Sequence, residues 1–184
     1  MLPGQNVRMI TRNQKLELSN SDTDHLRVAD ALQAVCKSFA EKLRDARIEL
    51  VQSYDYDAVV AADPGEFRQV LTCLISNAID AMPNGGSLHL EIHSDGKVVQ
   101  IVIADTGQGI LPDTRPYIFQ PFYTTKGDNG VGIGLWIARG IVEKAGGSIE
   151  LENLGAQSRC GARFLIQLPA ANARLHTLEE RGAA

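Results

Sequence analysis

One asparagine stands out on the polar side of the longest amphipathic pattern in the sequence. Asn77 lies between the small residues Ser76 and Ala78, which leave room for a ligand beside its side chain. The amide oxygen of an asparagine suits Mg²⁺, an ion that takes few protein ligands besides substrate phosphates. A solvated asparagine on an exposed helix face would give the same pattern, so Asn77 alone does not decide the chemistry.

A carboxylate and two glycines form a second candidate group. Asp105, Gly107 and Gly109 follow directly after a nearly continuous run of β-branched residues. A carboxylate at a strand end can accept a hydrogen bond from an exocyclic amine, while glycines let the backbone lie against a flat base. A tight turn that needs Asp and Gly for conformational reasons would have the same composition.

Alternating glycines precede a later helical pattern. Gly130, Gly132 and Gly134 would expose consecutive backbone N–H groups, and the helix N-terminus would add partial positive charge. This segment therefore predicts an anion site. Leu135 stands where the dinucleotide-binding fingerprint requires a third glycine, and the sequence has no Walker lysine motif. Both common phosphate-binding folds are thereby excluded.

Helical patterns are expected to carry the first and third of these groups. Asp63 as a cap, Pro64 at the first helical position and Glu66 three residues after the cap predict a helix over 64–82. Apolar residues at steps of three and four predict two more helices, over about 24–46 and over 133–145.

Strand patterns alternate with these helices and set the fold class. The predicted strands are residues 48–51, 87–93, 98–104, 148–152 and 162–168. Their order relative to the helices predicts an α+β fold, a two-layer α/β sandwich with a mixed sheet and helices on one face. The irregular segment 111–129, rich in Gly, Pro, Asp and Thr, is predicted to be a flexible lid.

Composition limits the classes of protein that this chain can represent. A net charge of −4, from 18 basic and 22 acidic residues, argues against nonspecific nucleic-acid binding. No apolar run reaches the roughly 20 residues that span a bilayer, and no signal-peptide pattern is present. Cys36, Cys73 and Cys160 lack the spacing of a disulfide framework or a zinc site, which favours the cytoplasm.

The order of the motifs resembles the N, G1, F and G2 boxes of the GHKL ATPases. The matching segments are Leu74–Ala81, Asp105–Gly109, Phe119–Lys126 and Gly130–Leu135. More narrowly, they resemble the catalytic and ATP-binding domain of bacterial sensor histidine kinases, because the forms Asn-Ala-Ile-Asp-Ala and Phe-Tyr-Thr-Thr-Lys are specific to that group. The resemblance is clear from about residue 63 to 169. Between residues 20 and 63 it is weaker.

The resemblance implies a role for each motif. Asn77 would hold the Mg²⁺ that bridges the phosphates of ATP, and Asp105 would accept from the adenine amino group. Asn77 and Lys126 would be the catalytic residues, with Lys126 and the glycine amides around the phosphates. The implied nucleotide-binding set is Asn77, Asp80, Ala81, Asp105, Gly107, Gly109, Ile110, Phe122, Thr124, Thr125, Lys126, Gly130, Val131, Gly132, Gly134 and Leu135.

The resemblance also implies a Bergerat ATP-binding fold and an ATP-dependent protein-histidine kinase. The γ-phosphoryl of Mg-ATP would pass to a histidine on a separate dimerisation domain, and a response regulator receiver domain would be a further partner. Residues 20–169 would form this cytoplasmic domain, 1–19 a connector from an absent dimerisation domain, and 170–184 a tail. No nucleic acid and no direct membrane contact are expected, although the full-length kinase could be membrane-anchored.

The sequence departs from the family pattern at position 73 and at positions 162–163. Cys73 stands where the family usually has another asparagine and where related hydrolases have a water-activating glutamate, so this chain should hydrolyse ATP slowly by itself. Ala162 and Arg163 replace a hydroxyl residue near the last strand, which would weaken adenine recognition.

The four histidines, His25, His89, His93 and His176, lie in no phosphoacceptor motif. On a strand, His89 and His93 would stand about 13 Å apart, too far to share one metal ion. Two alternatives to a kinase domain stay open. One is a kinase-inactive GHKL nucleotide-binding module, which Cys73 favours, and the other is an anti-sigma-type serine kinase.

Overall fold

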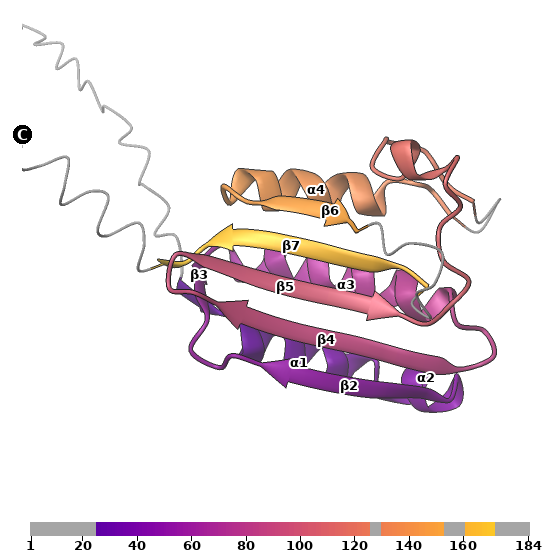
Figure 1. The fold of residues 1–184 in the computed structure, drawn as a ribbon, viewed down its shortest axis with the longest axis horizontal. Helices are drawn as coiled ribbons and strands as arrows, with labels where there is room; N and C mark the ends of the chain where they lie inside the picture. Colours follow the sequence, from indigo (N-terminus) through magenta and orange to yellow (C-terminus); the bar gives the residue numbers. More distant parts are fainter. Residues whose placement is uncertain (1–24, 126–129, 153–160, 172–184) are drawn as a thin grey trace, which may run out of the picture.

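A computed structural model describes residues 25–125, 130–152 and 161–171 of the chain (Figure 1). Its main sheet has five strands in the order β2-β4-β5-β7-β6. Strands β2 and β4 are parallel, and the other neighbouring pairs are antiparallel, so the sheet is mixed as predicted. The strands are β2 (Ile48–Tyr54), β4 (Gly86–Ser94), β5 (Val98–Asp105), β6 (Ser148–Leu151) and β7 (Arg163–Pro169).

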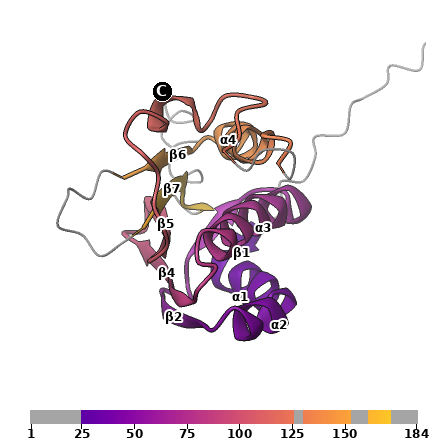
Figure 2. The same ribbon diagram turned by 90° about the vertical axis from the view of Figure 1, so that its right-hand side faces the viewer.

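The helices lie on one side of this sheet, which confirms the predicted two-layer sandwich (Figure 2). A separate two-stranded sheet pairs β1 with β3 in antiparallel register. The elements outside the main sheet are β1 (His25–Arg27), α1 (Val28–Ser38), α2 (Ala40–Asp45), β3 (Val59–Ala61), α3 (Pro64–Asp80), the short 3-10 helix η1 (Arg115–Tyr117) and α4 (Gly134–Lys144).

Alternation along β4 and the apolar stripe of α3 build the core between the two layers. Leu88, Leu90 and Ile92 of β4 are almost completely buried, while the residues between them face the other side of the sheet. The stripe on α3 buries Phe67, Val70, Leu71, Leu74, Ile75 and Ala78. Burial of these two sets fixes the helix against the sheet and so fixes the direction of its polar side.

The start of α3 follows its sequence signals closely. Asp63 is the N-cap, and its Oδ1 accepts a hydrogen bond from the backbone N–H of Glu66 at 2.8 Å. The Glu66 carboxylate forms an ion pair with Lys144, with 2.7 Å between Oε1 and Nζ. This ion pair joins the beginning of α3 to the end of α4. Asn77 lies on α3, and Gly134 is the first residue of α4.

The prediction of one helix over 24–46 is wrong. Residues His25–Arg27 form β1, because they pair with the short strand β3, whose three residues leave no periodic signal. The helical pattern is then interrupted at Phe39, whose backbone leaves the helical region (φ −98°, ψ 2°) while its side chain stays buried.

Two boundaries extend beyond their predicted positions. Strand β2 continues to Tyr54, because its pairing with β4 continues along the same register. Ala170 bridges Val60, and Ala170 and Ala171 are both buried, so the packed fold continues past the expected boundary at residue 169. The predicted connector, residues 1–19, lies outside the described residues.

Candidate functional site

The C-terminal half of α3 lies between two of the glycine segments. At its end, a Cβ on Gly107 would overlap the carbonyl oxygen of Ala81. Two turns earlier, a Cβ on Gly134 would lie 2.9 Å from the sulfur of Cys73. The positions 73 and 81 are about 12 Å apart along the helix axis, so the two glycine segments contact α3 at points about two turns apart.

Asp105 is the one buried polar or charged residue in the described part of the chain, with 3% of its surface exposed. It is the last residue of β5, and its Oδ1 accepts hydrogen bonds from the N–H groups of Gly107 at 2.8 Å and Ala162 at 3.2 Å. Burial raises the pKa of Asp105, and these two hydrogen bonds act in the opposite direction. The carboxylate is therefore held in one orientation by backbone groups.

Glycines allow backbone segments to approach one another closely around the Asp105 carboxylate. Gly109 has φ +73°, and a Cβ there would lie 2.8 Å from the carbonyl oxygen of Gly161. A Cβ on Gly161 would in turn lie 2.6 Å from the backbone nitrogen of Gly107 and would overlap the Asp105 carboxylate. Backbone thus packs on backbone around Asp105, and this cradle of glycines leaves no room for side chains at these positions.

Hydrogen bonds to α3 and β4 hold this turn in place. The N–H of Gln108 donates to the carbonyl oxygen of Ala81 at 3.1 Å. The hydroxyl oxygen of Thr106 accepts from the N–H of Ser87 at 2.9 Å. The Asp105 turn is therefore anchored to two elements that are distant in sequence, which fixes its position relative to α3.

The third glycine segment packs on the Phe-Tyr-Thr-Thr run. Gly132 has φ +72°, and a Cβ there would come within 2.6 Å of the backbone of Phe122. Phe122 itself has φ +65°, a left-handed conformation that is uncommon for a bulky residue. Gly134 begins α4, so the positive end of that helix lies beside Cys73 of α3.

Asn77 lies on the polar side of α3, half-buried, as the spacing predicts. Its side-chain Nδ2 donates to the sulfur of Cys73 at 3.7 Å. Because Cys73 also lies against Gly134, Asn77 stands near the start of α4. An amide oxygen at this place fits the ligand preference of Mg²⁺.

The remaining predicted residues are placed as follows. Ile110 is half-buried, and its carbonyl oxygen accepts from the Nε of Arg115 at 3.2 Å. Thr124, Gly130 and Leu135 are half-buried, while Asp80, Thr125 and Val131 are exposed. Lys126 and residues 127–129 lie outside the described residues, so the predicted lid is described only over 111–125.

Sequence reasoning missed Thr106 and Gly161. Thr106 lies inside the segment Asp105–Gly109, so a structural role for its hydroxyl could have been predicted from its place beside Asp105. Gly161 closes on Asp105 through the backbone from far along the chain, and such a contact has no signature in residue type or period. The structure also gives Ala162 a backbone role, since its N–H binds the Asp105 carboxylate.

His89 and His93 lie on the sheet face opposite the buried residues of β4. His93 contacts Glu91 at 3.4 Å, and within the described ranges no group of three or more metal-binding side chains occurs. The same ranges contain no helix that is long and apolar enough to cross a membrane.

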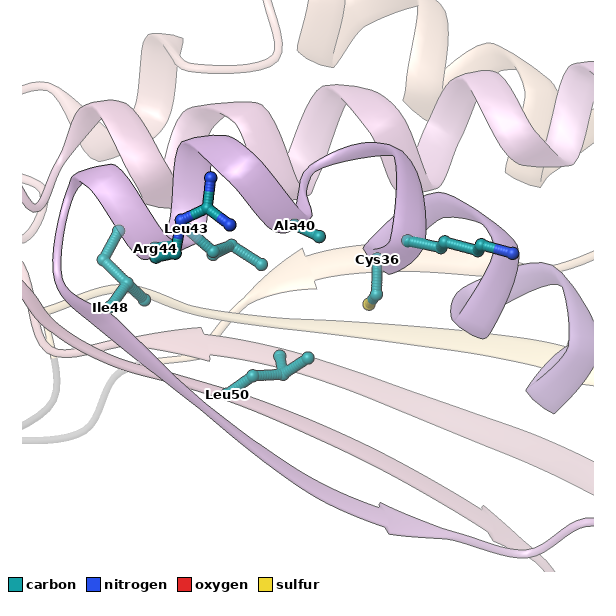
Figure 3. A pocket seen from close by; sticks show the side chains of 7 residues that line it. Cys36, Ala40, Leu43, Arg44, Ile48 and Leu50 are labelled. Carbon is teal, nitrogen blue, oxygen red and sulfur yellow. The ribbon is translucent and has the colours of Figure 1, made fainter.

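A groove of about 410 Å³ lies elsewhere on the molecule (Figure 3). It is bordered by α1, α2 and the edge strand β2, and Cys36, Lys37, Ala40, Leu43, Arg44, Ile48 and Leu50 line it. None of these residues belongs to the predicted nucleotide-binding set.

Comparison with known proteins identifies the group to which this geometry belongs. Residues 62–172 match the family described as histidine kinase-, DNA gyrase B-, and HSP90-like ATPase. Sensor histidine kinase ZraS of Escherichia coli O157:H7 is 39% identical over 110 residues, which are 60% of this chain and 23% of that protein. The chain therefore spans about a quarter of the length of this curated relative.

Solved structures of histidine kinases have the same fold as this chain over about four fifths of its length. The catalytic domain of histidine kinase ThkA has a TM-score of 0.72 and 30% identity, over 80% of this chain and 97% of that domain. Full-length ShkA in complex with AMPPNP has a TM-score of 0.69 and 27% identity, over 80% of this chain and 31% of ShkA. ThkA in complex with response regulator protein TrrA has a TM-score of 0.68 and 28% identity, over 81% of this chain and 42% of that one. This chain belongs to the histidine kinase-, DNA gyrase B- and HSP90-like ATPases, with the fold of a histidine kinase catalytic domain.

Proposed function

We propose that this chain binds Mg-ATP and transfers its γ-phosphoryl to a histidine on a separate dimerisation domain, as the catalytic domain of a sensor histidine kinase. The observation that carries this proposal is the buried Asp105 carboxylate, oriented by two backbone N–H groups inside a cradle of glycines. A carboxylate in this setting is suited to accept from the amino group of adenine, with Gly107 and Gly109 beside the base.

The other end of the site is suited to phosphates. The backbone N–H groups around Gly132 and Gly134 and the positive end of α4 would attract them. Asn77 would hold Mg²⁺ through its amide oxygen, and Mg²⁺ would neutralise charge on the phosphates during transfer. Lys126 completes the proposed set on the strength of the family motif alone.

Exposed apolar side chains border this phosphate end and would receive the dimerisation domain. Phe122 is 77% exposed, Val131 71% and Trp136 50%. Large apolar side chains that remain exposed together commonly mark a protein interface. A receiver domain is the proposed further partner, since ThkA is known in complex with a response regulator.

The proposed domain arrangement keeps residues 1–19 as the connector and moves the start of the tail from residue 170 to residue 172, because Ala170 and Ala171 are buried. We place the domain in the cytoplasm, because three widely spaced cysteines without a pairing pattern suit a reducing compartment. No contact with nucleic acid or membrane is part of the proposal.

One observation favours a second candidate, a nucleotide-binding module without kinase activity. Cys73 occupies the position where the family usually has a further asparagine. A module of this kind would bind ATP in the same site but would not phosphorylate a partner.

A phosphotransfer assay in trans separates the two candidates. Radiolabelled ATP is incubated with this chain alone and then with added dimerisation helices of the same kinase. The kinase proposal expects no label on the chain alone, and slow, acid-labile labelling of the added histidine, because the tethered effective concentration is lost. Proven ATP binding without label in the second tube would support the inactive module, and a chain that binds no adenine nucleotide would refute both.

A further inference from the structure

Cys73 contacts two residues at the proposed phosphate end from one position on α3. Its sulfur accepts a hydrogen bond from the Nδ2 of Asn77, one turn later on the helix, at 3.7 Å. The same sulfur lies against the first residue of α4, since a Cβ on Gly134 would come within 2.9 Å of it. The Cys73 side chain is half-buried and is therefore packed into the site.

The contact with Asn77 decides which atom of the amide faces the ligand. An asparagine amide has a donor nitrogen and an acceptor oxygen on opposite sides of one carbon. When Nδ2 is directed to the sulfur, Oδ1 is turned away from it. Rotation about the last side-chain torsion would exchange the two atoms, because that torsion is broad and roughly two-fold.

The contact with Gly134 connects the same sulfur to the phosphate-binding backbone. Gly134 has no Cβ, so the thiol can lie directly against the first turn of α4. A side chain at position 73 thus touches both the proposed metal ligand and the helix start that would face the phosphates.

We propose that Cys73 is a positioning residue that keeps the Oδ1 of Asn77 directed toward bound Mg²⁺ and α3 in register with α4. This inference rests on the proposed function and argues against reading Cys73 as a sign of an inactive module. Cys73 takes no part in the chemistry itself. Its effect passes through Asn77 and appears in the Mg²⁺ dependence of nucleotide binding.

The test measures the Kd of ADP by calorimetry with Mg²⁺ and with EDTA, and the ratio of the two values is the Mg²⁺ enhancement. Cys73→Ala should reduce this enhancement about threefold to tenfold, the loss expected for one hydrogen bond. Cys73→Ser should keep most of it, because a hydroxyl also accepts from Nδ2. Thr72→Ala, a change to an exposed neighbour on α3, is the matched control and should have no effect.

A double-mutant cycle isolates the contact. In an Asn77→Ala background, Cys73→Ala should leave the Mg²⁺ enhancement unchanged, because the side chain through which Cys73 acts is gone. An equal loss of affinity with and without Mg²⁺, or the same loss in both backgrounds, would overturn the inference while leaving the proposed function intact. A wild-type chain that binds no ADP would overturn the proposed function and the inference together.

A second measurement needs no substitution and covers the case in which Cys73→Ala does not fold. In the ¹⁵N-labelled wild-type chain, the Nδ2 protons of Asn77 should exchange with water more slowly than those of the exposed Asn84. Equal exchange rates for the two side chains would overturn the proposed hydrogen bond.

Discussion

Asp105→Asn tests the adenine contact without altering the shape of the side chain. In the folded chain the N–H groups of Gly107 and Ala162 both donate to the same oxygen, Oδ1, at 2.8 and 3.2 Å. The asparagine carbonyl can accept both, so the turn should persist. Its NH₂ group would then face the base, and it cannot accept a hydrogen bond from the adenine amino group.

The expected loss of affinity follows from the removed interaction. A hydrogen bond to a charged group contributes about 1.5–3 kcal/mol. At about 1.4 kcal/mol for each factor of ten, the Kd of ADP should rise about 10-fold to 150-fold. Calorimetry in the presence of Mg²⁺ measures this change. Asp45→Asn, which removes the same charge from a 76% exposed side chain on α2, should leave the affinity unchanged.

The thermal stability of Asp105→Asn should not fall at neutral pH, although its affinity for ADP should. Burial raises the pKa of Asp105 above 3.8, so the folded chain binds this proton more tightly than the unfolded chain. The resulting stabilisation is fully present below the unfolded pKa and is lost as the pH rises through the folded pKa. At pH 7 the Tm of Asp105→Asn should therefore equal or exceed that of the wild type, and this advantage should shrink as the pH falls toward 4.

Two outcomes would refute this reasoning. Wild-type ADP affinity in a folded Asp105→Asn chain would remove the carboxylate from the adenine site. A large fall in Tm at pH 7 would show that the ionised carboxylate stabilises the fold rather than serving the ligand.

Two further predictions address the glycines and the lid. Gly107→Ala should lower stability by about 1–3 kcal/mol and weaken ADP binding, because the new Cβ would overlap the Ala81 carbonyl oxygen. Gly140→Ala is its matched control: apart from its chain neighbours and the backbone of α4 itself, nothing lies within 4 Å of a Cβ at that position, so it should stabilise by about 0.5–1 kcal/mol without changing affinity. Thermal melting and calorimetry measure both variants, and equal effects of the two would contradict the proposed close approach. Hydrogen exchange across 111–129 should be fast in the free chain and slower with Mg-ADP, and equal protection in both states would rule out a nucleotide-dependent lid.

The sequence was sufficient to predict the helices and strands whose signals lie within a few residues of one another. The cap at Asp63, the apolar stripe of α3 and the alternation of β4 each follow from the residue types within one element, and the structure confirms them. The position of Asn77 on the polar side of α3 follows from the same stripe, because the residues opposite the apolar face of a helix must form its polar face. The order of the motifs is also a property of the sequence, and it agrees with the family that matches residues 62–172.

Tertiary structure alone decided how those motifs meet. β1 and β3 are three-residue strands that pair with each other across more than 30 residues of sequence, and the break at Phe39 depends on how its side chain packs in the core. Gly161 and Ala162 close on Asp105 from a distant part of the chain through backbone groups, and the sulfur of Cys73 meets Gly134 across two helices. A sequence period records which face of an element is buried, but backbone contacts between distant turns leave no periodic pattern in residue type, because they depend on the relative placement of whole elements.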